Sequence, residues 1–304
     1  MVNVDGAQDQ EMPHAGELMP RILRWIGLAA GGLVVLGIVG CVLVYGLSAR
    51  VLRRTYEVPV STLTTPTDPE SIREGRRLAT LHGCVRDCHG KQAEGRVMFD
   101  DRMIARIVAP NLTAAVRHYT DAQLAAIIRH GVRPDGRSLI VMPAEAFVGM
   151  TDDDVGRIIA FLKSLPLVPG PGPDIAIGPL GRLGLVVGKF VPAAAAVATA
   201  VPPPAAANQE AELGRYLART VCGECHGTSL RGAANPDFTS PDLRVVAAYS
   251  PEGFVRLLRT GIALGERQLG VMSEESRNNL SQLTDAEIAA LYSYLHALPE
   301  AAHH

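Results

Sequence analysis

The sequence has few aromatic residues, few charged residues and no excess charge of either sign. Aromatic residues make up 5% of the 304 residues and charged residues 20%, with 29 Lys and Arg against 31 Asp and Glu. The resulting net charge of −2 argues against a nucleic-acid-binding protein, which would carry a strong excess of basic residues to contact phosphates. The shortage of aromatic side chains also leaves little material for the cores of two small domains, the number that this length suggests.

Cysteine is scarce as well, and it is present in an odd number. The five cysteines are Cys41, Cys84, Cys88, Cys222 and Cys225. An odd count with two close pairs is not typical of a disulfide framework. Cys41 stands apart in an apolar stretch, which favours a buried free thiol. Residues 38–41 also resemble a lipoprotein processing box, so a lipidated Cys41 is the alternative.

One long segment has no formal charge at all. From Trp25 to Ala49 there is no Asp, Glu, Lys or Arg, and this stretch is longer than the roughly 20 helical residues that cross a bilayer core. The pattern predicts a disordered tail at 1–20 and a transmembrane anchor at 21–50, with a buried soluble helix as the alternative. The flanking basic residues slightly favour a cytoplasmic location for the chain that follows the anchor.

Two similar segments, 70–166 and 208–300, follow the anchor. Each contains a Cys pair followed directly by His, and each has a Gly eleven residues before a Met, at Gly131–Met142 and Gly261–Met272. They are therefore interpreted as two copies of one mostly helical domain. Residues 167–207 begin and end with Pro-rich runs and predict a semi-rigid, extended linker. Its apolar part, 178–190, is expected to be a short helix on a domain or on the membrane surface.

The second copy contains Cys222-Gly-Glu-Cys225-His226, the spacing at which c-type haem is attached. Two thiols one helical turn apart can add to the two vinyl groups of a porphyrin, and the following imidazole can then reach the iron. A zinc site would need further ligands, and a thioredoxin-type redox pair is the other alternative.

In the first copy, three residues rather than two separate Cys84 from Cys88, and His89 follows. Three interpretations remain: a bulged loop with both thioether bonds, one bond through Cys88 alone, or a copy without haem. The spacings that it shares with the second copy favour haem.

A haem iron that only carries electrons takes a second axial ligand, and methionine in that position raises its potential. In the second copy, Met272 is the only methionine after His226. The first copy offers Met98, Met103, Met142 and Met150. Met142 is preferred because it has the same offset from its Gly as Met272, and because Pro143 stiffens the turn that follows. If Met142 did not bind, the candidates would be His82, His118 and His130.

On these residues the sequence resembles class I c-type cytochromes, present twice in tandem. The resemblance implies an all-α chain, with one N-terminal transmembrane helix and two small cytochrome c domains joined by a Pro/Ala-rich linker. Two covalent haem c groups would be attached through Cys84, Cys88, Cys222 and Cys225. Their irons would be bound by His89 and Met142 in the first domain and by His226 and Met272 in the second. The helix crossing of the family would bring Gly75 to Phe161 and Gly214 to Tyr294.

The resemblance further implies a membrane-anchored dihaem cytochrome that transfers electrons between a respiratory donor and acceptor, rather than an enzyme. Haem is attached to such motifs outside the cytoplasm. Both domains are therefore expected in the periplasm and the tail in the cytoplasm, on a single-pass inner-membrane anchor and against the charge bias. The expected partners are redox proteins and not nucleic acid. The alternatives are a dihaem subunit of a larger oxidase or dehydrogenase complex, and a dihaem peroxidase, which would need an iron with an open site.

Overall fold

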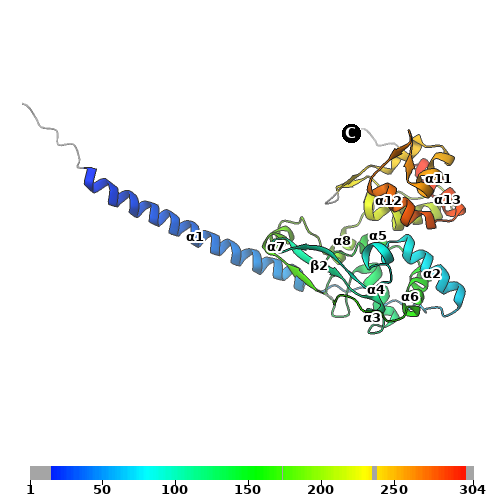
Figure 1. Ribbon diagram of the computed structural model, residues 1–304, viewed down its shortest axis with the longest axis horizontal. Helices are drawn as coiled ribbons and strands as arrows, with labels where there is room; N and C mark the ends of the chain where they lie inside the picture. Colours follow the sequence, from blue (N-terminus) through cyan, green and yellow to red (C-terminus); the bar gives the residue numbers. More distant parts are fainter. Residues whose placement is uncertain (1–14, 173, 235–237, 299–304) are drawn as a thin grey trace, which may run out of the picture.

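The computed structural model describes residues 15–172, 174–234 and 238–298, and it consists of one long helix and two small, mostly helical domains (Figure 1). Helix α1 (Ala15–Arg53) extends away from the domains, and residues 21–53 are long and apolar enough to cross a membrane. Because α1 begins at Ala15, residues 15–20 are helical and not part of a disordered tail; residues 1–14 lie outside the described residues. Cys41 is exposed on α1, so the protein does not bury the thiol that the sequence predicts to be buried.

The first domain follows α1. Its elements are α2 (Pro69–Leu81), the π-turn η1 (Cys84–Cys88), β1 (Arg96–Asp101), β2 (Ala105–Ala109), α3 (Leu112–Ala115), α4 (Asp121–His130), α5 (Ala144–Phe147) and α6 (Asp152–Ser164). Its core is a cluster of buried side chains from α2, α4, α5 and α6. Helix α6 begins where expected, because the Thr151 hydroxyl accepts a hydrogen bond from the amide of Asp154.

The second domain repeats this plan. Its elements are α9 (Glu210–Leu217), the π-turn η2 (Ala218–Cys222), α10 (Gly223–His226), β4 (Ala233–Ala234), β5 (Thr239–Ser240), η3 (Leu243–Ala248), α11 (Pro251–Thr260), β6 (Ile262–Ala263), β7 (Arg267–Gln268), α12 (Val271–Asn278), η4 (Leu280–Gln282) and α13 (Asp285–His296). Thr284 and Glu287 form a complete capping box at the start of α13. The last helix of the repeat therefore has the same start signal in both domains.

The predicted helix crossing is confirmed in both domains. An added Cβ on Gly75 would lie 1.9 Å from the carbonyl oxygen of Arg157, one turn before Phe161. An added Cβ on Gly214 would lie 2.1 Å from the carbonyl oxygen of Ala290, one turn before Tyr294. Only glycine allows α2 to approach α6, and α9 to approach α13, this closely.

The expectation of an all-α chain is confirmed for most of its length, but it missed three small sheets. Strands β1 and β2 pair antiparallel, with Phe99 opposite Ile107, and β3 (Ile175–Ile177) adds to the other edge of β2. All six residues of β1 are exposed. Because neither face of β1 is buried, its sequence shows no alternation of apolar and polar residues from which a strand could be predicted.

Residues 167–207 are folded onto the rest of the chain and are not simply an extended linker. Besides β3, they form α7 (Pro179–Val186), which packs against α1, and α8 (Ala193–Thr199), which packs against α4 and α5. Gly131 contacts α8 directly, since an added Cβ there would lie 2.5 Å from the Cβ of Ala193. The short helix expected at 178–190 is therefore present and lies beside α1.

Candidate functional site

His89 and His226 make the same hydrogen bond. The Nδ1 atom of His89 lies 2.8 Å from the carbonyl oxygen of Pro110, and that of His226 lies 2.8 Å from the carbonyl oxygen of Pro241. A carbonyl oxygen only accepts, so Nδ1 carries the proton in both rings and Nε2 keeps its lone pair. Burial lowers the pKa of both imidazoles, which favours the neutral form. Each ring is thereby prepared to bind a metal through Nε2.

The two proline carbonyls are themselves held in place. Asn111 caps the N-terminus of α3 by accepting a hydrogen bond from the amide of Ala114, and Asp242 caps η3 by accepting one from the amide of Arg244. These caps fix the chain directly after each proline. The matching triplets Pro110-Asn111-Leu112 and Pro241-Asp242-Leu243 thus orient the two histidines.

Each cysteine pair directly precedes its histidine, on helical backbone in the second domain only. No disulfide bond joins any of the five cysteines, all of which lie in the described part of the chain. Burial raises the pKa of Cys84, Cys88, Cys222 and Cys225 to about 12. A thioredoxin-type pair works through a thiol of lowered pKa, so this environment argues against that alternative.

The first domain absorbs its extra spacer residue in a bulge. Val85 is extended (φ −99°, ψ 153°) and Arg86 has a positive φ of 77°. The amides of Cys88 and His89 nevertheless donate to the carbonyls of Gly83 and Cys84, both at 3.1 Å. The backbone therefore has the bulged form of the first interpretation, and His89 reaches the same hydrogen bond as His226.

The methionines predicted as second axial ligands share their offset from a glycine but differ in local structure: Met142 precedes α5 in an irregular segment, whereas Met272 lies in the first turn of α12. Met142 and Met272 are half-buried, and each packs against the core of its own domain. Each follows a left-handed glycine, Gly131 or Gly261, that ends the preceding helix. The competing methionines lie elsewhere: Met150 is buried inside the core, whereas Met98 and Met103 are exposed.

The alternative histidine ligands of the first domain lie in three different environments. His82 is buried in the contact between the two domains, His118 is exposed, and His130 ends α4. Within the described residues, no group of three or more His, Cys, Asp or Glu side chains could hold a metal ion, so none forms a zinc site. Two soft cysteine sulfurs, a neutral imidazole and a thioether sulfur in each domain fit covalent haem instead.

The two Cys-His segments meet at the domain interface. Nδ1 of His82, two residues before Cys84, lies 3.1 Å from the carbonyl oxygen of Thr220, two residues before Cys222. The ring of His82 also packs edge-on against Phe147, with the ring centres 5.7 Å apart. Leu81, from the first domain, belongs to the apolar core of the second. The start of each Cys-His segment therefore contacts the other.

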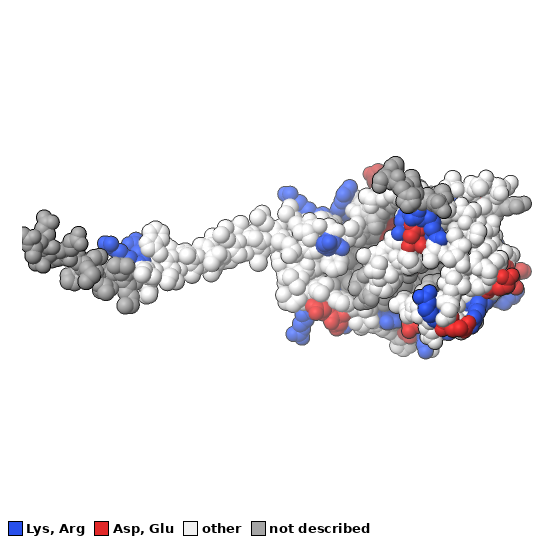
Figure 2. All heavy atoms as spheres, turned by 90° about the horizontal axis from the view of Figure 1, so that it is seen from above, with Lys and Arg blue, Asp and Glu red and all other residues white. Residues whose placement is uncertain are grey.

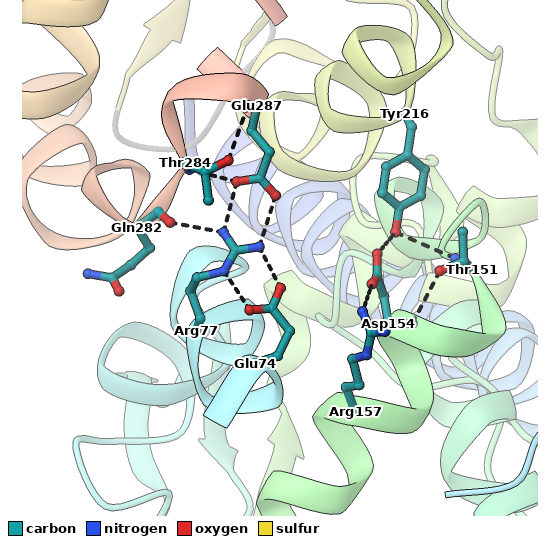
Figure 3. Close-up of polar contacts among 9 residues, drawn as sticks. All are labelled: Glu74, Arg77, Thr151, Asp154, Arg157, Tyr216, Gln282, Thr284 and Glu287. Atoms are coloured by element: carbon teal, nitrogen blue, oxygen red, sulfur yellow. Dashed lines mark hydrogen bonds and ion pairs between the residues drawn. The ribbon is translucent and has the colours of Figure 1, made fainter. Parts of the chain in front are cut away.

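Charged groups reinforce this interface (Figure 3). Arg77 on α2 donates to Glu74 on the same helix and, at 2.9 Å, to Glu287 and to the carbonyl oxygen of Gln282 in the other domain. Tyr216 on α9 donates to Asp154 on α6. The contacts between the domains carried no signal in the sequence, because Arg77 and Glu287, like Asp154 and Tyr216, are far apart along the chain.

An acidic residue lies between the two haem motifs. Glu224, in the spacer of the second motif, is exposed at its surface, but the surrounding protein and the negative charges of Glu275, Glu145 and Asp87 raise its pKa. Its charge in turn raises the pKa of Cys84 and Cys88 in the first domain. The interface therefore couples the two motifs electrostatically as well as through packing.

Two family models match the chain, one for each domain. The model described as cytochrome c matches residues 211–299. The model described as cytochrome c oxidase, cbb3-type, subunit III, matches residues 70–162. Together they cover most of the two copies of the repeat and leave α1 and all of 167–207 outside.

Curated relatives include cytochrome subunits of dehydrogenases. The fructose dehydrogenase cytochrome subunit of Gluconobacter japonicus is 26% identical over 269 residues, which are 77% of this chain and 55% of the relative. The cytochrome c subunits of alcohol dehydrogenase (quinone) from Gluconacetobacter polyoxogenes and Komagataeibacter europaeus are each 26% identical over 274 residues, 78% of this chain and 58% of the relative. The chain thus spans a little over half the length of these relatives. With two matching domain models, relatives of this kind and a repeated Cys-His geometry, the chain belongs to the c-type cytochrome family.

Proposed function

We propose that this chain is a membrane-anchored dihaem cytochrome that accepts electrons within a membrane dehydrogenase complex and passes them on at the periplasmic face of the inner membrane. The observation that carries the proposal is the pair of matched hydrogen bonds, His89 to Pro110 and His226 to Pro241, each at 2.8 Å. Two haem c groups, when bound, supply iron that alternates between its ferrous and ferric states. The chain supplies the side chains that would attach each haem and bind its iron.

Each domain contributes the same set of groups. Cys84 and Cys88, or Cys222 and Cys225, hold the porphyrin edge, and His89 or His226 presents Nε2 to the iron. Met142 or Met272 is the proposed second ligand. With an imidazole and a thioether supplied by the protein, both iron ligands would stay in place when the oxidation state changes, as an electron carrier requires.

The domain interface provides the route between the two sites. His82 and Thr220 bring the beginnings of the two Cys-His segments into contact at 3.1 Å. An added Cβ on Gly223, in the second motif, would lie only 3.9 Å from the Cβ of Ala146, on the first domain's α5. We therefore assign electron exchange between the two sites to this contact.

The names of the relatives favour a subunit of a dehydrogenase over a freely diffusing carrier. The match of the first domain to an oxidase subunit model keeps the oxidase complex as a second candidate. A peroxidase would need an open iron site, and the half-buried Met142 and Met272 argue against one.

The test is purification from membranes in mild detergent. We expect two covalent haem groups per chain, a reduced spectrum with the sharp visible bands of low-spin haem c, and a dehydrogenase subunit that copurifies and reduces both haems. A pigment-free chain contradicts the haem assignment. A dihaem chain that copurifies with an oxidase, or with no partner, contradicts the dehydrogenase assignment alone. Protease added to spheroplasts should digest both domains, whereas domains protected until lysis contradict the periplasmic orientation.

A further inference from the structure

Helix α7 presents an apolar stripe outward. Its inner side consists of the buried residues Gly181, Gly184 and Leu185. The outward residues Leu180, Leu183 and Val187, at the spacing of one helix face, are 51%, 42% and 60% exposed. A surface helix of a soluble domain has the opposite polarity, with polar residues outward. Phe190, just after the helix, is 45% exposed and extends this stripe.

This stripe is rigidly attached to the turn between β1 and β2. The amide of Gly178 donates to the carbonyl of Ile104 at 2.9 Å, and the amide of Leu180 donates to that of Met103 at 2.8 Å. Gly181 lies so close that an added Cβ would be 2.0 Å from the carbonyl oxygen of Ile104. Met103 is itself 52% exposed. We call Met103, Leu180, Leu183, Val187 and Phe190 the collar.

The collar lies at the depth where the membrane must end. Twenty residues separate Trp25 from Tyr45 on α1, which is about 30 Å of helix and matches the hydrocarbon core of a bilayer. Aromatic residues favour the two edges of that core. The guanidinium of Arg182 on α7 stacks over the Tyr45 ring at 4.7 Å and donates to the Ser48 hydroxyl at 3.1 Å. Helix α7 is therefore fixed beside the outer edge of the span.

Basic side chains accompany the collar. Arg50 and Arg53 lie in the last turn of α1, and Arg102 and Lys189 are exposed next to Met103 and Phe190. The nearby acids Asp100 and Asp174 are both paired with Arg106. In Figure 2, Lys and Arg side chains project from the end of the globular part at which α1 emerges. Such cations suit lipid headgroup phosphates, while apolar side chains enter the upper acyl region.

We propose that the collar is a second membrane contact, which lies in the interfacial layer of the same bilayer that α1 spans. The inference rests on α1 being a membrane span, as the proposed function requires. The lipid surface is preferred over a protein partner because α1 already places a bilayer at the level of Tyr45, beside the exposed stripe. The contact holds the first domain against the membrane.

The test uses the full chain with its haem groups, reconstituted in vesicles of phosphatidylcholine and phosphatidylglycerol. One phosphatidylcholine species carries a photoactivatable diazirine in the upper part of its acyl chain. After illumination and digestion, mass analysis locates the modified peptides. We expect modification of α1 and of peptides within 179–190. The exposed apolar residues Val245 and Val255 of the second domain serve as the internal control and should be modified at least about tenfold less.

A double variant, Leu183→Gln with Val187→Gln, sharpens the test. Because both side chains point outward, the variant should keep its haem content and the labelling of α1, while labelling within 179–190 falls. The matched control is Val245→Gln with Val255→Gln, which should change neither. Labelling confined to α1 in the parent chain overturns the collar and leaves the stripe to a protein partner. Absence of labelling in α1 as well overturns the membrane span, and the collar with it.

Discussion

The two Cys-His segments have different backbones and yet present their histidines in the same way. In the second domain, η2 and α10 run as one helical path from Ala218 to His226. In the first, α2 ends at Leu81 and the chain continues through a left-handed Gly83 and the bulge at 85–86. Both paths end with Nδ1 of the histidine 2.8 Å from a proline carbonyl. The comparison teaches that the histidine geometry is set by the proline loop, and that the spacer can vary around it.

The methionines offer the largest expected effect in this comparison. Met272→Ala and Met142→Ala should each lower the reduction potential of one haem by roughly a few tenths of a volt, because the thioether stabilises ferrous iron. A redox titration followed by visible absorption measures both haems in one sample. Met103→Ala, at an exposed position, is the control and should leave both potentials unchanged. If Met150→Ala, and not Met142→Ala, shifts the first haem, the proposed equivalence of the two domains is wrong in its ligands.

The helix crossings should respond equally to one added methyl group. Gly75→Ala and Gly214→Ala each place a Cβ within about 2 Å of a carbonyl oxygen, so each should destabilise its domain by about 3 kcal/mol. Gly156→Ala is the matched control, since its nearest contact is 3.4 Å away and alanine favours a helix. Urea denaturation followed by circular dichroism gives all three values. An effect on one domain only would show that the crossings are not equivalent.

The helix crossings and the repeated Cys-His segments are the part of the fold that the sequence predicts well. Gly75, Gly214, the threonine caps and the two Cys-His segments act locally or recur at a fixed spacing, so a repeat in one chain makes them visible. The domain interface could not be predicted in this way. Arg77 and Glu287 are 210 positions apart, and no local pattern links them. Helix α7 was predicted without its location, because an apolar stripe indicates burial but not what covers it.

The domain interface should weaken as the pH falls. Burial lowers the pKa of His82 to about 4, from an ordinary value near 6.5. The unfolded chain therefore takes up a proton below pH 6.5 that the folded chain refuses until about pH 4. The free energy of unfolding therefore decreases as the pH falls through this window, and at pH 5 it should be about 2 kcal/mol lower than at pH 7. Urea denaturation of the parent chain and of His82→Gln at both pH values tests this, and the variant should lose most of the difference. An unchanged pH dependence in the variant would rule out His82 as its source.

The smallest expected effect is a gain in the stability of the first domain. Arg86 has φ 77° and ψ −61°, a conformation that is strained for any residue with a Cβ. Arg86→Gly should raise the stability of the first domain by up to about 1 kcal/mol. Its guanidinium also donates to Asn278 at 3.2 Å, so Asn278→Ala is the control that removes this bond and keeps the strain. A loss of stability in Arg86→Gly larger than that in Asn278→Ala would contradict the strain argument.

The intact mass of the purified chain tests the central claim most directly, because the claim is that two unlike spacers hold the same group. We expect a mass gain of two haem groups, with one haem on the peptide that contains Cys84 and Cys88 and one on the peptide that contains Cys222 and Cys225. A gain of a single haem, confined to the second peptide, would contradict the account of the first domain.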